Sequence, residues 1–366
     1  MKHRMIHTLA WGIGCLACLL AVSCEQTDIT AATPATDSAL QLGVVEKLTQ
    51  ANDAKTRAAA GYEEMTVGDR LGLFRKGETV GTYTYTALRN VPYEYKKADA
   101  GATAPEWLPT GGDNNTVWLH LTADANVAAC YPYSTALPLV SGKEDAGIVN
   151  LTAAIRNAST PQDLWYAHCT ANGSDCKKDL QLTQAYCRMQ LTLLIDKSAT
   201  YTSEPYLYYL KIEGGRASAT SATDGIFSAA TLDLFKDAAS AYTLGAKDYT
   251  PVNVTANNYQ ITDNASTTKA AFDLMMIPAT LTGAVKLTIK TGGSSGAAKE
   301  MSVSIPAADF GGSLSAGKIY KVSVKIKGTD IDEFSSVTTD WSPAVSSGSG
   351  TTVNGQKYFD FSSPVF

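Results

Sequence analysis

Apolar and polar residues alternate with a period of two along most of the chain, and stretches with a helical period are scarce. Such alternation lets one face of a β-strand contact a core while the other faces solvent. It is clearest at 117–122, 189–196, 206–213, 285–305 and 320–327. Turn-forming residues recur between the runs, which is typical of all-β sandwiches. The pattern therefore predicts an all-β protein.

Three runs also predict which side chains face a core. In 285–305, a Gly-rich stretch at 291–296 separates two runs whose odd-numbered residues are apolar, and this predicts a β-hairpin. In the other two runs the expected inward rows are Tyr206, Tyr208, Leu210 and Ile212, and Tyr320, Val322, Val324 and Ile326.

The length suggests two domains. The chain has 366 residues, and a domain contains about 150 residues as a soft prior. The stretch from Thr170 to Asp179 is rich in turn formers, so we expect the boundary there. This gives an N-terminal sandwich over 58–176 and a C-terminal sandwich over 177–345. The remaining residues, 346–366, begin with the hinge-like sequence Ser346-Ser347-Gly348-Ser349-Gly350.

Composition narrows the class of protein further. Apolar residues make up 45% of the chain and charged residues 18%, so it can bury a sizeable core. The net charge is −5, without long blocks of one sign, which does not fit a nucleic-acid binder. The 18 tyrosines suit a half-wet β-sheet surface.

The N-terminus resembles an export signal. Lys2 and Arg4 precede an uncharged stretch from Thr8 to Ser23, which is short for a membrane span. The sequence Leu20-Ala21-Val22-Ser23-Cys24 resembles the lipobox of bacterial lipoproteins. We therefore expect a signal peptide at 1–23 and acylation, including palmitate, of Cys24. The alternative is an ordinary secretory signal in which Cys24 is incidental.

Four cysteines follow the signal and the acylated Cys24. In an oxidising compartment they allow three disulfide pairings, and they are equally compatible with free buried thiols. His168 beside Cys169 raises the alternative of a zinc site, but the spacing fits no compact Cys/His pattern. We expect neither a metal nor a cofactor. The four residues are Cys130, Cys169, Cys176 and Cys187.

No constellation in the sequence indicates catalysis. The Gly-rich run at 292–296 lacks the helix and the Lys-Ser/Thr pair of a phosphate loop. Asp330, Asp332 and Glu333 are too few oxygen ligands for an EF-hand and are expected in a solvated loop. His168 has no recognisable nucleophile partner, and no nucleophile elbow is present. We predict no catalytic residue and no enzymatic activity.

Five segments of the chain, taken in order, form a recognisable set of motifs. They are Val67-Gly68-Asp69-Arg70-Leu71-Gly72-Leu73-Phe74, Ala129-Cys130-Tyr131-Pro132-Tyr133-Ser134, Gln162-Asp163-Leu164-Trp165-Tyr166-Ala167, Cys187-Arg188-Met189-Gln190-Leu191 and Leu314-Ser315-Ala316-Gly317-Lys318-Ile319-Tyr320. Together they resemble the fimbrillin family, the type V pilins of Gram-negative gut and oral bacteria. The last segment leads to Asp340-Trp341, and Cys187 departs from the histidine that members often carry.

The resemblance implies two transthyretin-like, Greek-key β-sandwiches in tandem and a subunit that polymerises by donor-strand exchange. It also implies export as a lipoprotein and removal of a prosegment, residues 24–57, by an arginine-specific protease. Lys55-Thr56-Arg57-Ala58 offers a matching site, with the cut between Arg57 and Ala58. The precursor would lie at the outer membrane through its lipid, and the mature subunit in the cell-surface fimbrium with other pilin subunits.

Two segments fit the roles that strand exchange requires. In the prosegment, Leu40, Leu42 and Val44 alternate with polar residues, although 40–48 also has helical spacing. As a strand, this segment would plug a groove before cleavage. In the tail, one parity carries Val353, Phe359, Phe361 and Val365, a candidate donor strand for the next subunit. The alternative is a tail that completes its own sandwich in cis.

The competing function is a non-polymerising surface lipoprotein or tip adhesin that binds a glycan or a host protein. Exposed aromatic residues would then stack on sugar rings, whereas buried ones would be packing residues. The aromatic residues in question are Trp107, Trp118 and Trp165.

Overall fold

The structure, a computed structural model, is all-β, as the alternating pattern predicts. Its only helices in the described residues are the short 3₁₀ turns η2 (Glu144–Ala146) and η3 (Ala307–Phe310). None of its described helices is long and apolar enough to cross a membrane. The structure describes residues 37–48, 62–98, 101–111, 115–156, 163–195, 206–253, 259–260, 269–292, 299–327, 330–340, 351–353 and 356–358.

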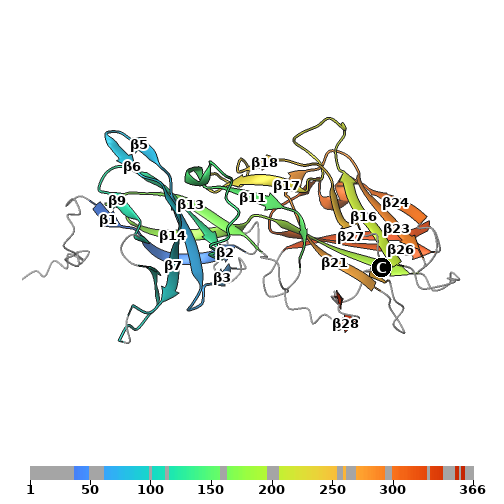
Figure 1. Cartoon of the computed structure of the whole chain (residues 1–366), viewed down its shortest axis with the longest axis horizontal. Coiled ribbons are helices and arrows are strands. Elements are labelled where there is room, and N and C mark those ends of the chain that lie inside the picture. Colours follow the sequence, from blue (N-terminus) through green and yellow to red (C-terminus); the bar gives the residue numbers. More distant parts are fainter. Residues whose placement is uncertain are drawn as a thin grey trace, which may run out of the picture. The chain divides into compact units, whose positions relative to one another are not determined.

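The N-terminal part is built on one eight-stranded sheet (Figure 1). Its order is β3-β2-β14-β13-β10-β4-β7-β8, with β2 parallel to β14 and the other pairs antiparallel. The strands are β2 (Gln41–Leu48), β3 (Tyr62–Glu64), β4 (Arg70–Arg75), β7 (Leu88–Lys96), β8 (Glu106–Pro109), β10 (Ala125–Tyr131), β13 (Trp165–Ala171) and β14 (Lys177–Gln184).

Two larger sheets make up most of the C-terminal part. One has the order β12-β21-β15-β26-β27, and the other has β19-β16-β23-β24 with β20 also paired to β16. Their strands are β12 (Ala154–Ile155), β15 (Cys187–Ile195), β16 (Tyr206–Gly214), β19 (Tyr249–Asn253), β20 (Tyr259–Gln260), β21 (Lys269–Met276), β23 (Val285–Gly292), β24 (Lys299–Ile305), β26 (Lys318–Lys327) and β27 (Asp330–Asp340).

Short sheets complete the architecture. They pair β1 with β9, β5 with β6, β22 with β25 and β28 with β29, and a three-stranded sheet has the order β11-β17-β18. These strands are β1 (Asp37–Ala39), β5 (Glu78–Val80), β6 (Tyr83–Tyr85), β9 (Trp118–His120), β11 (Ile148–Thr152), β17 (Ala229–Asp233), β18 (Tyr242–Leu244), β22 (Ala279–Thr280), β25 (Ser313–Leu314), β28 (Thr351–Val353) and β29 (Gln356–Tyr358).

The sheets do not follow one another simply along the sequence. After β10 the chain enters the C-terminal sheets through β11 and β12, and it then returns to the N-terminal sheet as β13 and β14. The turn-rich stretch from Thr170 to Asp179 joins β13 to β14 within one sheet. The chain leaves this sheet for the C-terminal sheets again after Gln184, and β15 begins at Cys187. The domain boundary expected near 176 stays a prediction.

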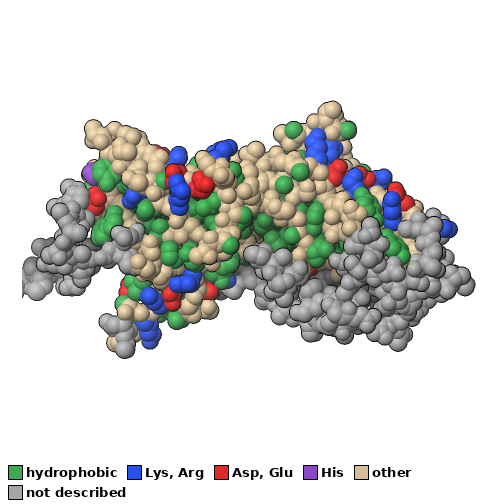
Figure 2. All heavy atoms as spheres, in the orientation of Figure 1, with side chains coloured by type: hydrophobic (Ala, Val, Ile, Leu, Met, Phe, Trp, Pro, Cys, Tyr) green, Lys and Arg blue, Asp and Glu red, His purple; other side chains and the backbone are tan. Residues whose placement is uncertain are grey.

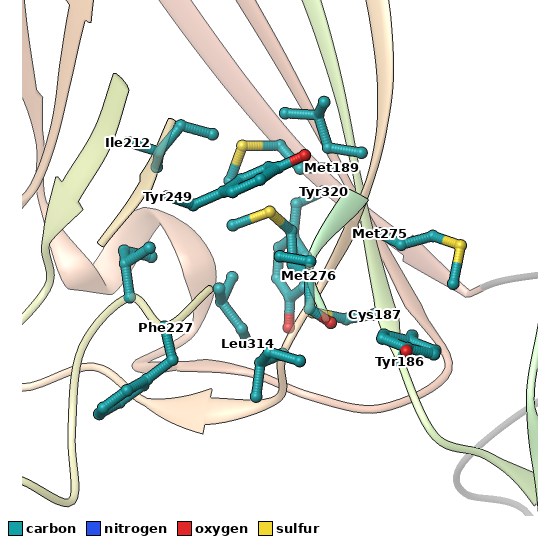
Figure 3. Packing of buried hydrophobic residues seen from close by; sticks show 14 of the residues in the cluster. Tyr186, Cys187, Met189, Ile212, Phe227, Tyr249, Met275, Met276, Leu314 and Tyr320 are labelled. Atoms are coloured by element: carbon teal, nitrogen blue, oxygen red, sulfur yellow. The ribbon is translucent and has the colours of Figure 1, made fainter. Parts of the chain in front are cut away.

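Two hydrophobic clusters form the core. The smaller one is drawn from the N-terminal strands and includes Leu71, Leu119 and Leu182. The larger one is drawn mainly from the C-terminal sheets and contains methionines among tyrosines, as Figure 3 shows. Thioethers adapt to irregular gaps and make favourable contacts with aromatic rings. The labelled examples are Met189, Met276, Tyr249 and Tyr320.

Two of the predicted inward rows are confirmed. In the hairpin, Val285 pairs with Ile305 and Ile289 with Met301, and all four are buried. On β26 the four predicted residues are all at most 2% exposed, which matches a strand held between β15 and β27. Period-two alternation is reliable here because the hairpin pairs without a register shift, as does β26 against β15. The register shift between β26 and β27, at Lys325/Ile326, leaves Asp332 as the extra residue of β27, so β26 keeps its alternation.

The prediction for β16 is wrong at Tyr208. Leu207 is fully buried there, while Tyr208 is half-buried. Leu207 and Tyr209 pair with the consecutive residues Thr291 and Lys290, so Tyr208 is the extra residue of a β-bulge. A bulge reverses the inward parity on one side of it, which is why Leu210 and Ile212 keep the predicted orientation.

The acidic segment that begins at Asp330 is also not a loop. It opens β27, which pairs antiparallel with β26 from Lys327 to Lys318. β27 is the last strand in the order of its sheet. Charged residues are common on edge strands because they discourage pairing with other chains. The acidic cluster is therefore compatible with strand structure, which the sequence interpretation missed.

We expect Gly72→Ala to lower the free energy of unfolding by about 1–3 kcal/mol, as overpacking does. A Cβ at Gly72 would lie 1.9 Å from Asn90 Oδ1 and 3.0 Å from Cys130 Sγ. Urea denaturation measures the change. Asn90 has a φ of 48°, which glycine adopts readily, so adding Asn90→Gly should recover part of the loss. Without any recovery, the collision with Asn90 is not the cause.

Candidate functional site

The predicted prosegment strand is present as β2, inside the N-terminal sheet. We call residues 37–48, which contain β1 and β2, the leader segment. β2 lies between β14 and β3, and β3 pairs with no other strand in the described part of the chain. Leu40 and Leu42 are buried, at 4% and 7% exposure. The leader segment therefore forms an integral part of the sheet and of its core.

Val44 does not face the core as predicted. It is 41% exposed, and Val45 is buried in its place. Leu42 pairs with Lys178 and Val45 with Leu180, so two leader residues oppose the single Asp179 in a β-bulge. Such a bulge depends on the partner strand, and its signal in the leader sequence is Gly43, an isolated glycine within a strand pattern.

Asp179 holds this bulge in place. Its Oδ1 accepts a hydrogen bond of 2.7 Å from the Val44 backbone N–H. A Cβ at Gly43 would come within 2.3 Å of the same oxygen, so the contact requires a glycine. Sequence reasoning missed Asp179 because an acidic residue beside a turn is ordinary. The structure shows that it recognises the leader backbone.

Further contacts tie both ends of the leader segment to the rest of the N-terminal part. The N–H of Leu40 donates to the Val117 carbonyl at 2.8 Å, and Tyr83 Oη donates to Asp37 Oδ2 at 3.4 Å. Burial, and then the charge of Asp37, raise the pKa of Tyr83. Near the other end, Lys47 Nζ lies 4.8 Å from the centre of the Tyr131 ring, a cation–π distance.

The remaining predicted site residues are only partly described. Val353 lies in β28, which pairs with β29 through Val353 and Gln356. Cys24, Arg57, Ala58, Phe359, Phe361 and Val365 lie outside the described residues. In the sequence, Arg57 falls between β2 and β3, so a cut there separates two adjacent strands of the sheet.

Motif residues far apart in the sequence meet in the fold. Asp69 Oδ1 accepts a hydrogen bond of 3.1 Å from Tyr131 Oη, and the N–H of Tyr133 donates to the Arg70 carbonyl at 2.9 Å. Within the last motif, Tyr320 Oη donates to the Ser313 carbonyl at 2.8 Å. The motifs therefore define the sheet framework rather than a reactive centre.

Two other motifs meet in a buried ion-pair cluster. Arg188 on β15 contacts both carboxylate oxygens of Asp273 on β21, with Nε 3.0 Å from Oδ1. Arg156 Nη1 lies 3.4 Å from Asp273 Oδ2, and its Nε lies 3.4 Å from Asp163 Oδ1. Burial raises the pKa of Asp163, although the arginines oppose that effect. The cluster ties the crossing segment around β12 to the C-terminal sheet.

The tryptophans proposed for glycan stacking are mainly core residues. Trp107 and Trp165 are 5% and 2% exposed, and Trp118 is half-buried on β9. Charged groups of both signs are interspersed on the face in Figure 2 rather than gathered by sign. The exposed large hydrophobic side chains in the described residues are Val44, Val67 and Leu121. These features give no specific support to an aromatic glycan platform.

The four cysteines after the leader are free thiols in this structure. Cys130 and Cys187 are fully buried, and burial raises the pKa of the Cys130 thiol to about 12. Cys169 is half-buried, and burial raises the pKa of its thiol to about 11. Among the described residues, no three His, Cys, Asp or Glu side chains gather as a metal site requires.

Comparison with known proteins identifies the family. A family model described as fimbrillin-like matches residues 56–341. Because this match covers well over half of the 366 residues, the chain belongs to the fimbrillin-like family. Membership implies a structural rather than an enzymatic role at the cell surface. No curated protein matches the chain.

Several solved structures are also similar to this chain. A candidate cell adhesion protein from Bacteroides uniformis is 17% identical, with a TM-score of 0.47 over 83% of this chain and 99% of that one. Another from Bacteroides ovatus is 13% identical, with a TM-score of 0.45 over 83% and 98%. A fimbrial assembly protein from Parabacteroides distasonis is 12% identical, with a TM-score of 0.36 over 83% and 96%.

Proposed function

We propose that the chain is a fimbrial subunit, exported as a lipoprotein acylated at Cys24, cut after Arg57 and polymerised by strand exchange. One observation supports this most directly: the segment upstream of Arg57 supplies an internal strand of the sheet, β2, between the edge strand β3 and β14. A removable strand at that place is what an assembly-controlled subunit requires, because its departure creates a binding site for another strand.

The energetics of the leader segment support this role. Its buried residues Leu40, Leu42 and Val45 each contribute about 1.5–3 kcal/mol when fully removed from water. Loss of β2 would also leave an edge of β14 without backbone partners. The tail of a second subunit, with Val353, Phe359, Phe361 and Val365 on one parity, would restore both kinds of contact.

The partners follow from this model. An arginine-specific protease acts on the precursor at the outer membrane, and other copies of the chain are the partners of the mature subunit in the cell-surface fimbrium. Adhesion to a host receptor or glycan would be a property of the assembled fibre. The proposal includes neither a cofactor nor a nucleic acid.

Limited digestion tests the function. We expect an arginine-specific protease to cut the purified precursor after Arg57 and ladders of subunits to follow on a denaturing gel. Arg57→Ala should leave the precursor uncut and monomeric, while Lys55→Ala should behave as the unmodified chain. N-terminal sequencing of the product identifies the bond. Ladders from uncut Arg57→Ala would contradict the cleavage step.

A further inference from the structure

We propose that the position between β3 and β14 is a binding site for the free leader peptide, which stays bound after the chain is cut. The leader then leaves only when a strand from a second copy replaces it. This inference rests on the proposed cleavage after Arg57. It adds to that proposal because it separates cutting from release and names the cut peptide as the site's first ligand.

The position of the cut supports this inference. Breaking the chain after Arg57 removes only the covalent connection between β2 and β3. The backbone pairs of β2 with β14 run from Gln41 to Lys47 and do not depend on that connection. β1 keeps its own pairs with β9, from Asp37 to Ala39. Two strand pairings therefore hold the leader after cleavage.

Side chains add to the hold of the backbone. Leu40, Leu42 and Val45 remain in the core, because the sheet that buries them is unchanged by the cut. Lys47, only 6% exposed, remains against the Tyr131 ring. After the cut, the leader and the rest of the subunit are two separate molecules. Because the leader is already bound when the chain is cut, the time for which it stays is set by its dissociation rate.

The bulge makes the site selective for the leader sequence. Asp179 accepts the Val44 N–H only where Gly43 leaves room for its carboxylate. A replacing strand with a side chain at that place must displace Asp179 and lose this hydrogen bond. Asp179 is thus a specificity-determining residue that favours the leader over other strands until exchange is driven by further contacts.

Retention has a consequence for where assembly occurs. The peptide that the cut separates from the subunit, residues 24–57, contains both the leader segment and Cys24, so a cut subunit that keeps this peptide bound is still anchored through the acyl chains on that residue. Cleavage alone would not free the subunit. It would leave it at the membrane surface, ready for exchange with a donor strand from a neighbouring copy.

The test uses the full lipidated chain in detergent, with a site-specific protease sequence replacing residues 52–57. After complete cutting, we expect the leader to co-elute with the subunit in gel filtration for hours and to separate in urea. When the cut subunit is transferred from detergent to lipid vesicles, it should float with the vesicles until a synthetic peptide of residues 351–366 is added. A leader lost as fast as the bond is cut would overturn the proposal.

Matched variants test the selectivity. Gly43→Ala should speed leader loss at least tenfold, whereas Val67→Thr, at an exposed position outside the leader segment, should stay within about twofold. Asp179→Asn keeps the shape of the side chain and should speed loss several-fold, which covers the case in which Gly43→Ala fails to fold. Equal rates for all three variants would overturn the role of the bulge.

Adding the leader in trans separates this proposal from the proposed function. A synthetic peptide of residues 36–50 should slow polymerisation of leader-free subunits, and its Gly43→Ala version should do so at least tenfold less well. Subunits that polymerise at the same rate with either peptide overturn the binding site but leave strand exchange intact. Leader-free subunits that never polymerise contradict strand exchange itself.

Discussion

Asp273→Ala is expected to lower the free energy of unfolding by about 3–5 kcal/mol, because it leaves the buried Arg188 without its partner. Arg188 and Asp273 are 1% and 3% exposed, and Arg156 contacts the same carboxylate. Water cannot replace the lost carboxylate at this depth. Urea denaturation of the purified chain, followed by the fluorescence of its tryptophans, measures the change.

Two further variants distinguish a lost charge partner from general damage. Replacing both members, Arg188→Met with Asp273→Leu, should recover most of the loss, because no uncompensated charge then remains. Glu300→Ala removes an exposed ion pair with Lys290, in which the Lys290 side chain is 40% exposed and the Glu300 side chain 54%. It should lower the free energy of unfolding by less than about 1 kcal/mol. A double variant as unstable as Asp273→Ala would show that the ion pair is not responsible.

The sequence predicts regular strands well and bulges poorly. The hairpin of β23 and β24 and the inward row of β26 follow from alternation, since each residue steps evenly past its partner. At Tyr208 and Val44 an extra residue enters one strand, and the parity changes there. Whether a bulge forms is decided by the partner strand, which a single segment does not reveal.

The topology of the sheets could be predicted from the sequence less well than the strands themselves. The excursion of β11 and β12 into the C-terminal sheets is fixed by contacts made far away in sequence, such as Arg156 with Asp273. A turn-rich stretch such as Thr170–Asp179 is the same locally whether it joins two domains or two strands of a hairpin. Local pattern alone therefore does not show which of the two connections such a turn makes.

The candidate site was predictable to the extent that it depends on local pattern. Leu40 and Leu42 are apolar at alternate positions and both are buried, Leu42 within β2 beside β14 and Leu40 just before that strand. The contacts of Asp179 and Lys47 could not be predicted without the strand pairing, because each of these side chains contacts a residue of another strand. Contacts of this kind, made between two strands, are not encoded in the pattern of either strand alone.

Deletion of residues 351–366 is expected to abolish fibre growth while leaving a folded subunit that is still cut after Arg57. The truncated chain keeps β14 and can accept a strand, but it has no tail to donate. It should therefore cap growing fibres when mixed with intact subunits, and their mean length should fall as its share rises. Electron microscopy and gel ladders measure both effects.

The candidate donor residues of the tail all lie at odd-numbered positions, and this allows a more specific control. Phe359→Asp with Phe361→Asp places charges on the row expected to enter the core of the next subunit, and it should block growth like the deletion. Asp360→Asn changes the residue between them, on the opposite parity, and should leave fibres unchanged. Normal fibres from the truncated chain would instead assign the tail a role within its own subunit, and β14 would then have to receive its strand from another part of the chain.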